Sequence, residues 1–208
     1  MPQRKTDIYK RLTRSHLEAI GRVAATWSLL ERMVLSTLST ISGVGLDKAI
    51  TLAGPSAFAS WIDMLLSLAR SSKEHKHKEG EYEAISKLLL KLLNRRNYIV
   101  HAVWQIPLHG GPGLINRRMY AAPTASSKIE ADGFPKRGRE WIIRVAWTSK
   151  QMRHIATLIE KARIMLLEIQ MRPLPASPKE RISHTHLRQR NLHKIRAMLD
   201  SLPDPFRK

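Results

Sequence analysis

Three side chains that could act together on a phosphate group occur within six residues near the middle of the chain. The stretch "LLLKLLNRRNYIVHAVW" (88–104) has leucines at helical spacing and contains Arg96, Asn97 and His101. Because each helical residue advances by about 100°, Arg96 falls within roughly 20° of the centre of the apolar stripe, and Asn97 and His101 share a flank beside it. A guanidinium directed at a core is costly unless it is paired or lines a hydrated cleft. These three residues are therefore candidates for a site.

A matching anomaly lies in an earlier helical pattern. Glu31 falls within the apolar stripe that Trp27, Val34 and Leu38 define. One inward carboxylate and one inward guanidinium, in two helices that both need core partners, predict that Glu31 and Arg96 meet. Two interpretations remain open: a buried ion pair that fixes helix packing, or a carboxylate that holds Arg96 in a site. His101 is likewise either a structural histidine or a catalytic one.

The overall charge points to a polyanionic partner. The 208 residues include 36 Lys and Arg against 17 Asp and Glu, a formal net charge of +19. Such an excess favours nucleic acids, because each neutralised phosphate releases counterions. The chain has no cysteine, which excludes disulfides and thiolate chemistry. The charged N-terminus lacks the apolar region of a signal peptide, and no apolar run reaches the length of a membrane span, so we expect a soluble, cytoplasmic protein.

The hydrophobic periodicity predicts a mainly α-helical domain with one inserted β-hairpin. Apolar residues recur every three or four positions in the segments that we expect to be helical, which are 15–42, 46–54, 56–70, 81–104 and the segment beginning at "TSKQ". Alternating residues predict strands at 114–122 and 140–148. Thr148 and Gln151 have the spacing of a capping box.

The domain organisation follows from these segments. We expect a basic N-terminal arm (1–14), a helical domain (15–171) with an insertion at about 105–147, and a basic C-terminal tail (172–208). In that tail, Ser177 and Pro178 could begin a short helix.

These residues and their setting resemble the HEPN family. "RNYIVH" (96–101) is similar to the family motif, in which an Arg is followed by a polar residue and then by a His near the end of the third core helix. "TWSLLERMV" (26–34) resembles the aromatic-then-Glu first helix of a group of bacterial HEPN-like proteins. A common variant of the motif has Gly after the His, where this chain has Ala102. The resemblance covers roughly residues 15–171.

The resemblance implies a four-helix bundle that dimerises, with the motifs of both protomers facing one cleft. Many members are metal-independent ribonucleases of toxin–antitoxin, anti-phage or RNA-processing systems, and others are catalytically silent. We therefore expect either an endoribonuclease, with RNA as substrate and an antitoxin or inhibitor as a further partner, or a non-catalytic RNA-binding or regulatory dimer. As an enzyme it would use His101 as acid or base, Arg96 to stabilise charge and Asn97 to orient the imidazole or bind phosphate. No cofactor or metal is expected.

Other side chains offer weaker candidates. Trp104, just past the motif, is a candidate for stacking on a base, and together with Arg95, Arg117 and Arg118 it makes up the expected RNA-binding set. "HKH" (75–77) and "SHTH" (183–186) have the form of metal-binding pairs, but no carboxylate cluster accompanies them. We interpret these histidines as surface residues. The tail is interpreted as an arm that tethers RNA, with a partner-binding helix as the competing interpretation.

Overall fold

Six α-helices and a short three-stranded sheet make up the part of the chain that the computed structural model describes. That part comprises residues 13–54, 57–101, 103–104, 118–121 and 143–203, with side chains described for 13–54, 57–101 and 147–203. The helices are α1 (Arg14–Ser42), α2 (Leu46–Ala53), α3 (Phe58–Ser71), α4 (Glu79–Val100), α5 (Ser149–Met171) and α6 (Pro178–Asp200), and a 3₁₀ turn, η3 (Lys76–Lys78), precedes α4. All the predicted helices are present, with ends shifted by a few residues. Of the predicted N-terminal arm, residues 1–12 lie outside the described residues.

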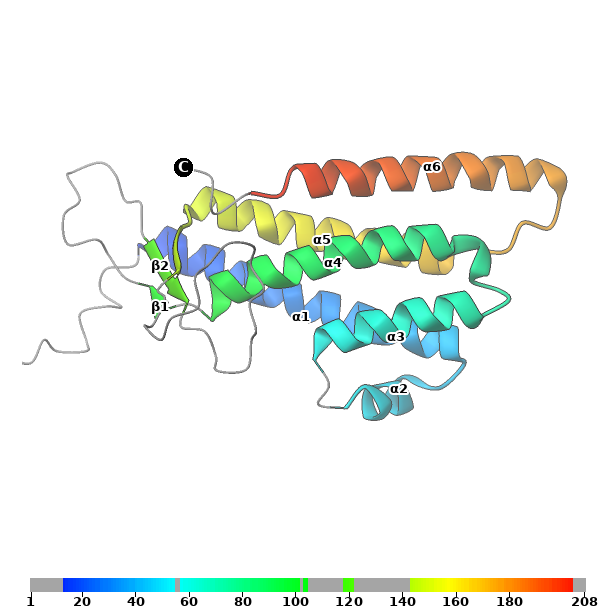
Figure 1. Cartoon of the computed structure of the whole chain (residues 1–208), viewed down its shortest axis with the longest axis horizontal. Helices are drawn as coiled ribbons and strands as arrows, with labels where there is room; N and C mark the ends of the chain where they lie inside the picture. The colour runs from blue at the N-terminus through cyan, green and yellow to red at the C-terminus, as the bar shows by residue number, and fades with distance from the viewer. Residues whose placement is uncertain (1–12, 55–56, 102, 105–117, 122–142, 204–208) are drawn as a thin grey trace, which may run out of the picture.

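One hydrophobic core lies among α1, α3, α4 and α5. The helix α1 packs most extensively against α5, and α4 contacts α1, α3 and α5. The long helices α1, α4, α5 and α6 run along the long axis of the molecule (Figure 1). The largest fully buried side chains come from α1, α3 and α4, with one more just before α5: Trp27, Leu30, Ile62, Leu65, Tyr82, Ile85, Leu88, Leu89, Leu92, Ile99 and Trp147. The mainly helical bundle expected from the periodicity is therefore present.

Local hydrogen bonds fix the starts of the last two helices where the sequence predicts them. At α5, the Thr148 side chain accepts from the Gln151 backbone N–H at 3.1 Å, and the Gln151 side chain accepts from the Thr148 backbone at 2.9 Å. At α6, the Ser177 hydroxyl accepts from the Glu180 backbone N–H at 3.2 Å, and Pro178 opens the helix. Both caps satisfy backbone donors that have no partner inside the helix.

The helix α4 ends earlier than the periodicity predicts. The expected helix reached Trp104, but α4 stops at Val100, and His101 caps it by donating its backbone N–H to the Asn97 carbonyl at 3.1 Å. Val103 and Trp104 instead form a short strand, which β-branched and aromatic residues favour. His101 therefore lies at the helix terminus, where its side chain is less confined than within a helical turn.

The strands form one antiparallel sheet beside this terminus. Their order is β1 (Val103–Trp104), β2 (Arg118–Ala121) and β3 (Ile143–Ala146). Val103 pairs with Tyr120, and Met119 pairs with Val145. The segments 105–117 and 122–142 lie outside the described residues. That the insertion is one continuous β-hairpin therefore stays a prediction.

The segment expected to be a basic tail contains a long helix that packs on the bundle. The helix α6 lies mainly against α4, where Asn191, Ile195 and Met198 are buried. It has 23 residues, about twice a typical globular helix, and its other faces are strongly basic. No helix in the described part of the chain is both long and apolar enough to cross a membrane.

Candidate active site at the end of α4

The side chains of Arg96, Asn97 and His101 meet at the C-terminal end of α4. The Nη1 group of Arg96 donates to Asn97 Oδ1 at 3.1 Å and also contacts His101 Nε2 closely. Asn97 and His101 are exposed, whereas Arg96 is half-buried. The expectation that these three residues form one constellation therefore agrees with the geometry.

The arginine determines which nitrogen of His101 carries the proton. A guanidinium only donates hydrogen bonds, so His101 Nε2 must accept, and the neutral ring then carries its proton on Nδ1. Burial lowers the pKa of His101 below its usual value, and the positive charge of Arg96 lowers it further. Both effects disfavour the imidazolium. The histidine is therefore neutral at physiological pH, which is the form that a general base requires.

The guanidinium of Arg96 lies over the ring of Trp27. Its central carbon is 5.8 Å from the ring centroid, within the range of a cation–π interaction. Trp27 is 1% exposed and packs at a tilt against Phe58, with ring centroids 4.7 Å apart. Its indole Nε1 donates to Glu31 Oε1 at 2.7 Å. The first helix thus provides a fixed aromatic surface under the arginine.

The predicted direct pairing of Glu31 with Arg96 is wrong. No ion pair joins the two residues in the described part of the chain, and Glu31 instead accepts a hydrogen bond from Trp27. Because Trp27 contacts both, the carboxylate supports the guanidinium through the indole. Helical spacing placed Glu31 and Arg96 on facing stripes, but it could not show that a tryptophan fills the space between them.

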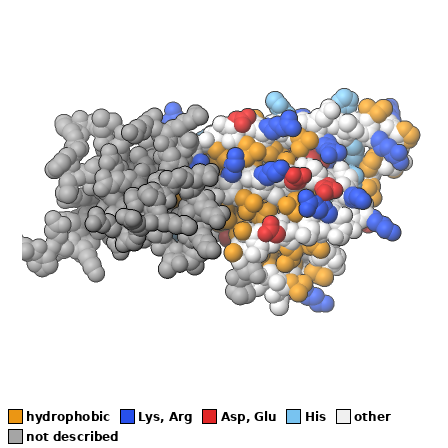
Figure 2. Space-filling model, in the orientation of Figure 1, with side chains coloured by type: hydrophobic (Ala, Val, Ile, Leu, Met, Phe, Trp, Pro, Cys, Tyr) orange, Lys and Arg blue, Asp and Glu red, His pale blue; other side chains and the backbone are white. Residues whose placement is uncertain are grey.

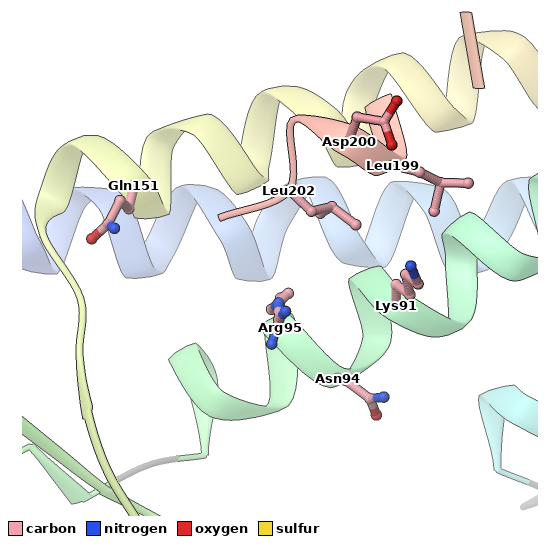
Figure 3. A pocket seen from close by; sticks show the side chains of 7 residues that line it. All are labelled: Lys91, Asn94, Arg95, Gln151, Leu199, Asp200 and Leu202. Atoms are coloured by element: carbon pink, nitrogen blue, oxygen red, sulfur yellow. The ribbon is translucent and has the colours of Figure 1, made fainter. Parts of the chain in front are cut away.

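Arg95 lines a cavity on another side of α4 from Arg96. Figure 3 shows Arg95, Lys91 and Asn94 on α4 opposite Gln151 of α5 and the end of α6. The cavity measures about 680 Å³, and Asp200 is the only acidic residue among those that line it in the described part of the chain. Arg95, which helical spacing directs toward solvent, is half-buried. Successive helical residues are about 100° apart, which explains why Arg95 and Arg96 serve different surfaces.

The other predicted RNA-binding residues are only partly covered by the structure. Arg117 lies outside the described residues. Trp104 ends β1 and Arg118 begins β2, but their side chains lie outside the described part. Their assignment to RNA binding stays a prediction.

A second polar cluster, at the other end of α4, was missed by the sequence analysis. Arg172 donates to Glu81 through both terminal nitrogens, at 3.1 Å for Nη1 with Oε1, and Asn191 Nδ2 donates to Glu81 Oε1 at 3.0 Å. The side chains of Glu81 and Arg172 are 0% and 8% exposed. The signal was present, because Glu81 lies one helical turn before Ile85 on the apolar stripe of α4. Its partners, however, are some 90 and 110 residues further along the chain.

The described histidines do not assemble a metal site. No group of three or more His, Cys, Asp or Glu side chains with the geometry of a metal site occurs within the described ranges. The candidate pairs "HKH" and "SHTH" nevertheless meet, because the rings of His77 and His184 are 6.5 Å apart between centroids. This proximity was not expected from the sequence.

No family model, no curated protein and no solved structure matches the chain. The likeness to HEPN proteins therefore depends on the motif at 96–101 and its helical setting. What the geometry offers chemically is a neutral histidine, an exposed amide and a guanidinium held on an aromatic ring, all directed at one place at the end of a helix.

Proposed function

We propose that the protein is a metal-independent endoribonuclease of HEPN type, with Arg96, Asn97 and His101 as its catalytic residues. The observation that carries this proposal is that the Arg96 guanidinium contacts both Asn97 and His101, next to solvent at the end of α4. Cleavage of RNA without a metal needs a base, an acid and positive charge beside the phosphorane. The constellation supplies a neutral imidazole and a permanent cation.

A phosphodiester would first compete for Arg96. Arg96 currently donates to two neutral acceptors, and a phosphate oxygen is a stronger acceptor because the hydrogen bond then joins opposite charges. Movement of the guanidinium onto the phosphate frees His101 Nε2. That nitrogen then removes the proton from the ribose 2′-hydroxyl as the 2′-oxygen attacks phosphorus. Asn97, beside Arg96, then orients the His101 imidazole or binds the phosphate.

The second proton transfer is assigned to a second copy of His101. As the bond from phosphorus to the 5′-oxygen breaks, an imidazolium must protonate that oxygen, and each chain provides a single histidine at the motif. The negative charge of the bound phosphate favours the protonated form of the second ring, which is neutral in the free protein. A homodimer with a composite active site supplies both. The products are a 2′,3′-cyclic phosphate and a 5′-hydroxyl. In a cell such an activity would suit a toxin or an anti-phage effector restrained by an antitoxin or inhibitor protein.

One observation favours the alternative, a non-catalytic RNA-binding or regulatory dimer. In the free protein Arg96 occupies His101 Nε2, the nitrogen that a base would use. If RNA does not displace this contact, the arginine and histidine serve to bind or to pack, and no cleavage follows.

The test is cleavage of a labelled, mixed RNA pool in EDTA, with the product ends mapped. We expect the wild type to produce cyclic-phosphate ends, and His101→Ala to lose about 10²–10⁴-fold in rate, the usual contribution of general acid–base catalysis. His193→Ala is the matched control, because His193 is exposed on α6. Undiminished cleavage by His101→Ala would falsify the assignment. RNA binding without cleavage by the wild type would favour the non-catalytic dimer.

A further inference from the structure

A second, strongly basic cavity lies at the end of the bundle where α6 begins. It measures about 310 Å³, and six of the residues that line it carry polar side chains: His77, Arg172, Arg181, His184, Thr185 and Arg188. His77 comes from the 3₁₀ turn before α4, whereas His101 follows the other end of α4. A helix of 22 residues rises about 33 Å, so this cavity is distant from the candidate active site. Figure 2 shows Lys, Arg and His side chains at this end of the molecule.

The positive charge around this basic cavity is only partly compensated. Arg172 is neutralised by Glu81, but Arg181 and Arg188 form no ion pair within the described residues. The neighbouring Glu180 forms no ion pair with either arginine within the described residues, and its Oε2 accepts from the Ala176 backbone N–H at 2.6 Å. No carboxylate lines the cavity in the described part of the chain. An anion entering it would meet two uncompensated guanidinium groups.

Several polar atoms around the basic cavity are shielded from solvent yet make no hydrogen bond within the described residues. They are the Nδ1 atom of His184, the Nε atom of Arg172 and at least one ring nitrogen of His77, because the Glu74 carbonyl can accept from only one of the two. Arg172 is more than nine-tenths buried, so its Nε–H has no access to bulk water. Buried polar groups normally have hydrogen-bond partners, and several without one around a single cavity indicate a ligand with several acceptors.

A glycine gives Arg188 its position. A Cβ atom at Gly80 would lie 2.6 Å from Arg188 Nη2, so the guanidinium rests against the first turn of α4 and a larger side chain at Gly80 would displace it. On α6, Arg181, His184, Thr185 and Arg188 follow the i, i+3, i+4, i+7 spacing of one helix face. The basic face of α6 is thus directed at the start of α4.

We propose that this basic cavity binds a phosphoryl group, as a free polyphosphate or as part of RNA. Tetrahedral oxyanions offer several acceptors at once, which suits the two uncompensated guanidinium groups and two imidazoles that line this cavity. A cation is disfavoured by the surrounding charge. The proposal does not depend on the nuclease activity, because none of these residues belongs to the motif at 96–101.

The titration of His77 provides a readout. Burial lowers the pKa of His77, the charges of Lys78, Arg172 and His184 lower it as well, and the Glu74 carbonyl partly offsets them. A bound phosphoryl group adds negative charge beside the ring and must raise this pKa. A matching change at His101 is not expected at this distance.

The test is titration of the full-length protein with pyrophosphate at constant ionic strength, followed by calorimetry and by NMR of the histidine rings. We expect saturable binding of one pyrophosphate per chain, with shifts at His77 and His184. Arg181→Ala and Arg188→Ala should each weaken binding about tenfold or more, the usual effect of losing a charged hydrogen-bond donor. Arg196→Ala, an exposed arginine of α6 outside the cavity, is the matched control and should bind normally.

Gly80→Ala separates binding from folding. Alanine favours a helix over glycine, so this variant should be at least as stable as the wild type, yet it displaces Arg188 and should weaken pyrophosphate binding several-fold. The proposal is overturned if binding does not saturate, if Arg196→Ala weakens it as much as Arg188→Ala, or if the His77 ring is unaffected.

Competition identifies the source of the phosphoryl group. In the His101→Ala background, which avoids cleavage, RNA with a 5′-phosphate and RNA with a 5′-hydroxyl are each added to the pyrophosphate complex. Displacement by both identifies the RNA backbone, displacement by the first alone identifies an RNA end, and displacement by neither identifies a free polyphosphate. Each of these outcomes upholds a phosphoryl site. Since His101→Ala keeps the basic cavity intact, failure of the nuclease proposal would leave pyrophosphate binding unchanged.

Discussion

An arginine lies at each end of α4, Arg172 from the end of α5 and Arg96 from α4 itself, and the two have opposite surroundings. At the N-terminal end, Arg172 donates to the carboxylate of Glu81, which also accepts from Asn191, and the group is buried. At the C-terminal end, Arg96 is half-buried and donates to an amide oxygen and to the neutral ring of His101. One positive charge is neutralised inside the protein, and the other is not.

This difference distinguishes a group that stabilises the fold from one that is available to a ligand. A buried ion pair is strongly destabilising to break, because one charge is then left without compensation. A guanidinium with neutral acceptors keeps its capacity to attract an anion, and its loss costs the fold little. The contrast predicts that substitutions at the two ends will affect different measurements.

The largest expected effect is on stability at the N-terminal end. Glu81→Ala leaves Arg172 buried without a counter-ion and should lower the free energy of unfolding by about 3–5 kcal/mol. Arg96→Ala removes a cation–π contact on a half-buried surface and should lower it by less than about 1 kcal/mol. Urea unfolding followed by circular dichroism measures both.

Glu83→Ala is the matched control for that experiment. Glu83, on the same helix, has 44% of its side chain exposed and pairs with Lys87 at 2.8 Å, where solvent screens the interaction. It should therefore lose much less stability than Glu81→Ala. Equal losses for the two variants would show that the buried cluster does not stabilise the fold as argued.

A smaller effect is expected beneath the C-terminal arginine. Trp27→Phe keeps an aromatic ring under Arg96 but removes the N–H that Glu31 accepts, so stability should fall by about 1 kcal/mol and RNA cleavage by about tenfold. Glu31→Gln keeps an acceptor for the indole and should change both much less. If Glu31→Gln is instead the more damaging variant, the carboxylate charge acts on Arg96 directly, and the indole is not the link.

The sequence predicted most of the helices and the members of the candidate site. Periodicity located the first five helices, whereas Ser177 and Pro178 indicated the sixth, and the caps at Thr148 and Ser177 fixed the starts of the last two. Arg96, Asn97 and His101 were brought together by helical spacing alone, because the residues lie within six positions of one another. Local information was sufficient wherever the interaction itself was local.

Interactions between distant segments were not predictable in the same way. The cluster of Glu81, Arg172 and Asn191 depends on how α5 and α6 return along α4, which no local pattern specifies. The meeting of His77 with His184 depends on the same path. The role of Trp27 was missed for another reason, since a buried aromatic residue on a core stripe is normally explained by packing alone.

The smallest expected effect concerns the protonation of His101. It tests the contact between Arg96 and His101 at the C-terminal end of α4. Burial disfavours the protonated ring, and the positive charge of Arg96 disfavours it further, so the pKa of His101 should be below 6.5, and below that pKa the ring loses its function as a base. In Arg96→Gln the charge is gone but the burial remains, so the pKa should rise part of the way toward 6.5, whereas Arg95→Gln, on the other surface of α4, should leave it nearly unchanged. Nitrogen-15 NMR of the histidine rings gives both the pKa and the tautomer. We expect the neutral ring of the wild type to carry its proton on Nδ1, and to lose that preference in Arg96→Gln. A wild-type ring protonated on Nε2 would contradict the contact with Arg96, and the guanidinium would then be free to bind phosphate without first releasing the histidine.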